Sequence, residues 1–170
     1  MLLLSISLTA QLPESIDYRG ELPPVMDQGK NGNCLAMAVS VMMTWKGSSE
    51  YTPQFIYNNR QDSNELDMGD IKRILNIKAI SVKRIEELKT ALSQNGPCII
   101  NFQIYNHATT IWKPIDSRRV AGMHSMLVVG YNLDGFILRN SWGTDWGDNG
   151  YCIFPYDDWK WKWEVWTFID

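Results

Sequence analysis

The pattern of hydrophobic and polar residues divides this chain into a helical first half and a β-rich second half. Residues 34–45, CLAMAVSVMMTW, are almost wholly apolar and stop just before Gly47, which predicts a buried helix. Further along, Ile85, Leu88 and Leu92 form an apolar stripe at helical spacing that ends at Asn95-Gly96. The predicted helices are residues 34–45, 52–63, 69–77 and 82–96.

Beyond Pro97 the chain is dominated by short runs of β-branched and aromatic residues. Turn sequences such as NLDG and GDNG separate these runs. The predicted strands are residues 98–105, 124–131, 135–140, 151–156 and 159–168. Helices followed by antiparallel strands indicate an α+β fold with segregated elements, and the junction between the two halves is a natural place for a cleft.

The last of these strands contains four tryptophans within residues 159–166. Trp159, Trp161, Trp163 and Val165 alternate with charged residues, which favours a half-buried strand whose tryptophans face the core or an interface. The alternative is that the tryptophan rings stack on a ligand.

Composition and charge exclude several classes of protein. A chain of 170 residues is long enough for one compact domain, and its net charge of -3 comes without a basic cluster, so no nucleic-acid partner is expected. The opening MLLLSISLTA lacks preceding basic residues and is too short to span a bilayer, so no membrane association is expected. Residues 1–11 are expected to form an N-terminal strand, or else to be the remnant of a leader.

The three cysteines, Cys34, Cys98 and Cys152, cannot all pair within one chain, so at least one thiol is free. Cys98 and Cys152 lie in apolar strand-like runs, which favours buried free thiols over a disulfide between them. So few cysteines favour an intracellular or reducing environment without excluding secretion. No paired C-x-x-C or H-x-x-x-H spacing occurs, so neither a metal nor another cofactor is expected.

Cys34 is the first candidate for chemistry, because it stands where a Gly- and Asn-rich turn enters the predicted helix. A thiol attacks as a thiolate, which a helix N-terminus and a basic partner both favour. The partner must be one of two histidines. His124 opens a predicted strand after a turn of small residues, whereas His107 is expected in a loop, so His124 is the better candidate.

Three other residues could complete such a site. Asn140 ends a predicted strand and could accept a hydrogen bond from the second ring nitrogen of His124, and Trp142 could shield that bond from water. Gln28, six residues before Cys34, could donate its amide to an oxyanion together with the Cys34 backbone N–H. Each assignment is weak alone, and their joint order along the chain strengthens all of them.

This order of residues resembles the papain family of cysteine peptidases, over roughly residues 12–158. QGKNGNC is similar to the family's Q-G-x-C-G-S-C loop, and GMHSMLVVGY is similar to G-x-H-A-[VL]-x-x-V-G-Y. LRNSWGTDWGDNGY is similar to N-S-W-G-x-x-W-G-x-x-G-Y, the most specific of these matches. The motifs look closer to compact bacterial or viral-type members than to lysosomal or plant ones.

The resemblance implies a role for each matching residue. Cys34 would be the nucleophile, His124 the general base and acid, Asn140 the residue that orients His124, and Gln28 the oxyanion donor. The implied substrate-binding residues are Trp142, Gly122 and Gly69, the last standing in for the family's Gly-Gly substrate clamp.

The resemblance also implies a single two-lobe catalytic module over residues 1–170. Residues 12–97 would form the helical lobe, and residues 98–170 an antiparallel β-barrel-like lobe, with the cleft between them. Only eleven residues precede the mature-like LPES, too few for an inhibitory pro-segment, so we expect activity to be restrained by other means unless the segment is missing.

Four departures from the family pattern bear on these expectations. Asn31 stands where the family has a disulfide cysteine, Leu35 replaces an aromatic residue, and Ser125 replaces an alanine. His124 and Asn140 follow Cys34 by 90 and 106 residues, fewer than the about 130 to 150 typical of the family, which indicates trimmed loops.

The implied function is a cysteine endopeptidase or exopeptidase that hydrolyses peptide bonds through a thioester. One alternative is a catalytically silent papain-like module that binds a peptide or protein, and another is an acyl transferase or deubiquitinase-like enzyme with the same chemistry. The expected partners are a polypeptide substrate and a protein inhibitor, and the chain is expected to be a monomer.

Overall fold

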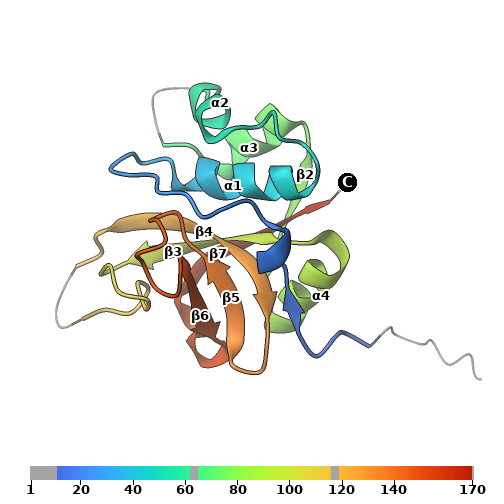
Figure 1. Cartoon of the computed structure of the whole chain (residues 1–170), viewed down its shortest axis with the longest axis vertical. Helices are drawn as coiled ribbons and strands as arrows, with labels where there is room; N and C mark the ends of the chain where they lie inside the picture. Colours follow the sequence, from blue (N-terminus) through green and yellow to red (C-terminus); the bar gives the residue numbers. More distant parts are fainter. Residues whose placement is uncertain (1–10, 62–64, 116–118, 170) are drawn as a thin grey trace, which may run out of the picture.

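A computed structural model describes residues 11–61, 65–115 and 119–169 (Figure 1). The helices are α1 (Cys34–Trp45), α2 (Pro53–Asn58), α3 (Met68–Leu75) and α4 (Ile85–Asn95), with short 3-10 helices η1 (Arg19–Glu21) and η2 (Tyr156–Trp161). The strands are β1 (Ile16–Asp17), β2 (Lys78–Ser81), β3 (Cys98–Ile104), β4 (Gly122–Tyr131), β5 (Gly135–Arg139), β6 (Tyr151–Pro155) and β7 (Lys162–Ile169). The expected sequence of helices followed by strands is confirmed, and β1 and β2 were not predicted.

The strands form one antiparallel sheet in the order β2-β7-β3-β4-β5-β6, with β1 added at the end of β4. Hairpins connect β4 to β5, and β5 to β6. Gly130 on β4 faces the backbone of β1 so closely that a Cβ there would collide with the carbonyl oxygen of Ile16. Only glycine therefore allows β1 to join the sheet at this point.

Helices α1, α2 and α3 cover one face of the sheet (Figure 1). Helix α1 is buried over nearly its whole length, as its apolar sequence predicts, and its residues pack on side chains such as Leu127 and Val129 of β4. Successive side chains of a strand point to opposite faces, so Met126 and Val128 belong to the other face.

That other face carries a second core, which contains the aromatic side chains of Phe102, Trp112, Phe136 and Phe154. Helix α4 contributes to this core, and it lies on the opposite side of the sheet from α1 (Figure 1). The expected helical lobe of residues 12–97 groups α4 with α1–α3. In the structure α4 packs on the opposite face of the sheet, because Leu88 and Leu92 of its apolar stripe are fully buried in the second core.

The prediction of a strand over residues 159–168 is wrong at its N-terminal end. Residues 156–161 form η2, and the strand begins only at Lys162. The buried carboxylate of Asp158 accepts a bond from Trp112 Nε1 at 3.0 Å and pairs with Lys113 at 2.8 Å, which holds this segment in a tight turn.

The predicted orientation of Trp163 is also wrong. A register shift between Asn101 and Phe102 interrupts the pairing of β3 with β7, so Val165 is fully buried whereas Trp163 is 57% exposed. Trp159 and Trp161 pack against the second core, as expected.

No helix in the described part of the chain is long and apolar enough to cross a membrane. The prediction of an N-terminal strand or leader remnant concerns residues 1–11, of which only residue 11 belongs to the described residues.

Candidate active site

Cys34 is the first residue of α1, and its side chain is partly exposed. The first turn of a helix has backbone N–H groups without intrahelical acceptors, so this end carries a partial positive charge that favours a thiolate. Leu35 and the next eight residues are buried, which fixes the helix against the sheet and with it the position of the Cys34 sulfur.

The loop before Cys34 is held by hydrogen bonds in place of the family's disulfide. Gln28 Nε2 donates to the backbone carbonyl of Asn31 at 2.7 Å, and the backbone N–H of Gly29 donates to Asp27 Oδ1 at 2.8 Å. Gly29 has a φ of 63°, which glycine adopts without steric cost. Asn31, the residue that replaces the bridging cysteine, is thus tied to the loop through its main chain.

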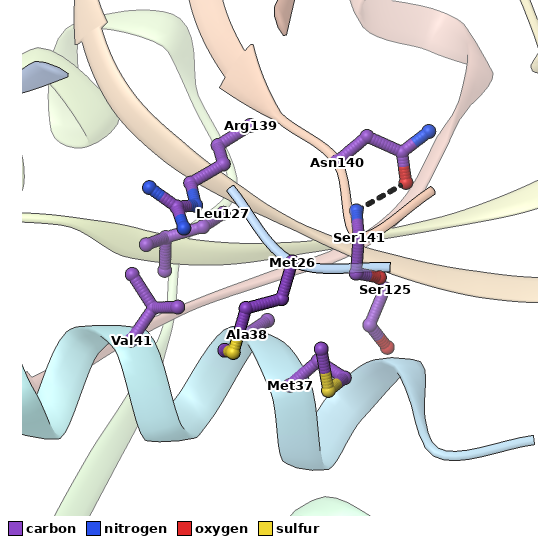
Figure 2. A pocket seen from close by; sticks show the side chains of 9 residues that line it. All are labelled: Met26, Met37, Ala38, Val41, Ser125, Leu127, Arg139, Asn140 and Ser141. Carbon is purple, nitrogen blue, oxygen red and sulfur yellow. Dashed lines mark hydrogen bonds between the residues drawn. The ribbon is translucent and has the colours of Figure 1, made fainter. Parts of the chain in front are cut away.

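His124 lies on β4 with its ring hydrogen-bonded to Asn140, the residue after β5. The Nε2–Oδ1 distance is 2.7 Å. The same oxygen accepts the backbone N–H of Ser141 at 2.8 Å, a bond drawn in Figure 2. Two donors converge on this atom, which identifies it as the amide oxygen and places the imidazole proton on Nε2. Nδ1 is therefore left as the proton acceptor, the tautomer that a general base requires.

Trp142 lies beside His124, and its role in shielding the hydrogen bond from water stays a prediction. Its ring lies 4.6 Å from that of His124 and 5.1 Å from that of His107, and Trp146 Nε1 donates to the His107 carbonyl at 2.9 Å. Burial lowers the pKa of His124 to about 4, the Asn140 hydrogen bond opposes this shift, and the charge of His107 adds to it. The free imidazole is therefore neutral near pH 7, the form in which Nδ1 carries a free lone pair.

Cys34 and His124 line one cleft, of about 210 Å³, between the helical layer and the sheet. Its other lining residues are Gly32, Leu35, Glu65, Leu66, Asp67, Asn101, Met123, Ser125, Trp163 and Glu164. Cys34 thus comes from the start of a helix and His124 from a strand, and the structure brings both to one cleft.

The floor of this cleft is a polar row that crosses three strands. Asn101 of β3 stands opposite Ser125 of β4 on one side and Glu164 of β7 on the other. Ser125 Oγ donates to Asn101 Oδ1 at 2.8 Å, so the serine that replaces the family's alanine has a partner. Glu164 is half-buried and accepts Trp166 Nε1 at 3.1 Å.

Gln28, Gly122 and Gly69 are not among the residues that line this cleft. Gln28 joins the candidate site through Ser141, whose Oγ donates to Gln28 Oε1 at 2.6 Å. Gly122 begins β4, two residues before His124, and Gly69 lies in the first turn of α3 just after the cleft residue Asp67. Neither glycine is among the lining residues, and their substrate-binding roles stay predictions.

Sequence reasoning missed Trp163, Glu164 and Asn101 as cleft residues. The two residues on β7 belong to the stretch whose alternation predicts an inward-facing Trp163, and only the register of β3 brings Asn101 beside Ser125. Among the described residues, no group of three or more His, Cys, Asp or Glu side chains could hold a metal ion.

The other two cysteines are free thiols, as expected. Burial raises the pKa of both the Cys98 and the Cys152 thiol to about 12, so neither forms a thiolate near neutral pH.

We therefore expect iodoacetamide at pH 7 to alkylate Cys34 alone in the folded protein. Peptide mapping by mass spectrometry after a short exposure measures this, and the denatured protein is the control in which all three thiols react. Modification of Cys98 or Cys152 before Cys34 would contradict the assignment of the reactive thiol.

The comparison with protein families identifies the family of this chain. Residues 43–160 match the model of the papain family of cysteine proteases, a region that contains His124 and Asn140. The chain belongs to this family. Cys34 and Gln28 precede the matched region, so their placement rests on the structure and on the loop sequence.

Curated relatives of this papain-family chain come from several kinds of organism. It is 24% identical to cysteine proteinase 3 of Entamoeba histolytica over 196 residues, which cover 85% of this chain and 63% of the relative. It is 26% identical to the viral cathepsin of Lymantria dispar multicapsid nuclear polyhedrosis virus over 132 residues, 74% of this chain and 37% of the relative. The chain thus spans less than two thirds of the length of these relatives.

Solved structures show the same fold. Xylellain, a cysteine protease from Xylella fastidiosa, superposes with a TM-score of 0.69 at 22% identity, over 94% of this chain and 87% of that one. Digestive procathepsin L 3 of Tenebrio molitor larval midgut superposes with a TM-score of 0.72 at 16% identity, over 97% and 72%. The α+β papain-like fold predicted from the sequence is confirmed.

Proposed function

We propose that this chain hydrolyses peptide bonds through a covalent thioester on Cys34. The observation that carries this proposal is the meeting of Cys34, at the positive end of a buried helix, with a neutral His124 oriented by Asn140 in one cleft. Family membership supports the same chemistry.

In the first half of the reaction, His124 Nδ1 takes the proton of the Cys34 thiol, and the sulfur attacks the carbonyl carbon of the scissile bond. The carbonyl oxygen becomes an oxyanion, which the Cys34 backbone N–H and the Gln28 side-chain amide stabilise. For this the Gln28 amide exchanges its bond with the Asn31 carbonyl for one with the oxyanion. The intermediate then collapses, the C–N bond breaks, and His124 gives its proton to the leaving amine.

In the second half, water replaces the amine. His124 takes a proton from the water molecule, the resulting hydroxide attacks the thioester, and the Cys34 sulfur leaves. His124 then returns its proton to the Cys34 thiolate, so the products are a carboxylic acid and the regenerated enzyme. Asn140 keeps the His124 ring in one orientation through both halves, and Trp142 keeps water away from their hydrogen bond.

The experiment that tests this function is incubation of the purified chain with an unfolded protein and with internally quenched peptides, followed by mass spectrometry of the products. New termini formed with multiple turnovers support hydrolysis. Binding of the same peptides without cleavage would instead favour the silent binding module.

An added amine nucleophile separates hydrolysis from acyl transfer. A carboxylic acid as the main product at millimolar amine supports the hydrolase, and an amide product supports the acyl transferase.

The cleft lining favours a basic side chain in the substrate. Glu65, Asp67 and Glu164 bring three carboxylates to it, and none of the lining residues is Lys or Arg. The exposed ring of Trp163 stands in the same cleft, and a cation over an indole face gains roughly 0.5–1 kcal/mol at exposed sites.

We expect Glu164→Gln to lower the ratio of kcat/KM between an arginine-containing peptide and its methionine analogue by roughly tenfold, which corresponds to about 1.4 kcal/mol. Steady-state kinetics on the matched peptide pair measure this. The control is Glu65→Gln, since Glu65 is exposed at the rim and its effect should be smaller. An unchanged kcat/KM ratio in Glu164→Gln would show that Glu164 does not contribute to the preference for a basic side chain.

We further propose that the chain acts as a monomer, that a protein inhibitor restrains it, and that it works in a reducing environment. Three free cysteines, one of them the partly exposed nucleophile, support the last of these.

A further inference from the structure

Arg139 is a buried cation that the proposed chemistry does not use. It is the last residue of β5, directly before Asn140, and only 4% of it is exposed. Within the described part of the chain no carboxylate forms an ion pair with it. A guanidinium is costly to bury unless its N–H groups find acceptors. The acceptors of Arg139 therefore show which part of the chain this side chain stabilises.

Its acceptors are two consecutive backbone carbonyls. Arg139 Nη1 donates to the carbonyl of Pro23 and Nη2 to that of Pro24, both at 2.6 Å, and Nη1 also reaches the Tyr151 hydroxyl at 3.2 Å. Prolines have no N–H, so their carbonyls are the only backbone groups by which this stretch can be held. Two fixed φ angles also make the stretch stiff, so that fixing both carbonyls sets its direction.

Four residues after Pro24 the same segment reaches Gln28, the proposed oxyanion donor. In between, the backbone N–H of Gly143 donates to the Met26 carbonyl at 3.3 Å. The Gln28 N–H then donates to the Ser141 carbonyl at 2.8 Å. The segment 23–28 thus runs along residues 139–143 and is bonded to them at both ends.

The segment borders a small gap in the packing. A cavity of about 10 Å³, the size of a single water molecule, lies between the segment, helix α1 and the sheet. Figure 2 shows Met26 and Arg139 on its border together with Ser141, Leu127 and Val41. The polar bonds at its two ends hold the segment beside this gap.

We propose that Arg139 is a positioning residue for the oxyanion site: its guanidinium fixes the carbonyls of Pro23 and Pro24 and thereby places the Gln28 amide. Three consecutive residues then contribute to the same site. Arg139 holds the start of the oxyanion segment, Asn140 orients His124, and Ser141 bonds to Gln28. This inference rests on the proposed function, since it assumes that an oxyanion forms.

The test compares Arg139→Met with Arg139→Lys in the full chain. Methionine keeps most of the side-chain length and removes every donor, so we expect kcat to fall about 30-fold with KM nearly unchanged, which is less than the about 10²–10³ that losing a whole oxyanion donor costs. Lysine keeps the charge and one donor group and should restore part of the loss. Arg84→Met, at an exposed arginine, is the control and should leave kcat unchanged.

Two measurements separate positioning from a general structural role. The rate of Cys34 alkylation by iodoacetamide, followed across pH, needs no oxyanion and should be the same in Arg139→Met as in the parent. In a Gln28→Ala background, Arg139→Met should lower kcat by less than about threefold, because the group that it positions is already absent.

Hydrogen exchange supplies a readout that does not depend on turnover. The backbone N–H groups of Gln28 and Gly143 should exchange faster in Arg139→Met, whereas those within α1 should not change.

The inference is overturned if Arg139→Met lowers kcat by the same factor with and without Gln28, if the pH profile of Cys34 alkylation shifts, or if exchange rises equally throughout the chain. If Arg139→Met does not fold, the same comparisons are made with Arg139→Lys. A parent chain that cleaves no peptide would contradict the proposed function instead, and hydrogen exchange would still test whether Arg139 holds the segment.

Discussion

Replacing Cys34 with alanine should lower kcat/KM for a peptide substrate by roughly 10⁴-fold or more, to a rate that cannot be distinguished from the background. Alanine has no nucleophile, so no thioester can form, and the other groups of the cleft can only bind and polarise the substrate. The measurement is steady-state hydrolysis of a quenched peptide by the parent and by Cys34→Ala.

The fold should survive this change, because Cys34 lies at a helix end with its side chain partly exposed. The thermal midpoint of Cys34→Ala should therefore stay within a few degrees of the parent, and the peptide should still bind. Cys152→Ala is the matched control and should keep full activity. Residual turnover above about 1% of the parent rate in Cys34→Ala would show that another group attacks the substrate.

The second large effect is expected at His124. His124→Gln keeps a polar side chain of similar size but removes the proton acceptor, so kcat should fall by about 10³–10⁴ at pH 7. The control is His107→Gln, which changes the histidine on the other side of Trp142 and leaves the hydrogen bond between His124 and Asn140 in place.

A comparable loss in both histidine variants would contradict the assignment of His124 as the only base. Raising the pH should restore part of the alkylation rate of Cys34 in His124→Gln, since hydroxide then replaces the imidazole as proton acceptor. An alkylation rate at pH 7 equal to that of the parent would show that His124 does not activate the thiol.

The elements that carry the chemistry were predictable because their signals are local. The apolar run after Cys34 predicts the buried helix, and the β-branched run after His124 predicts the strand. The order of Gln28, Cys34, His124 and Asn140 then indicated which residues meet, and the structure brings Cys34 and His124 to one cleft and hydrogen-bonds Asn140 to His124.

The rest depends on contacts between distant parts of the chain. The exposure of Trp163 follows from a register shift between β3 and β7, and the bonds from Arg139 to the carbonyls of Pro23 and Pro24 join residues that are more than 100 positions apart. The bond from Gln28 to Asn31 is local, but the sequence offers no sign that this amide supports the loop in the free protein. Such features appear only when strand register and loop path are known.

The proposed reaction passes through a thioester on Cys34. Rapid acid quenching of a single turnover, with an activated peptide ester as substrate, followed by intact-mass analysis and peptide mapping, detects this intermediate. We expect an added mass equal to the acyl group, located on Cys34, that decays with time and is absent in Cys34→Ala. An acyl group on any other residue, or cleavage at the full rate with no acylated species at any quench time, would contradict it.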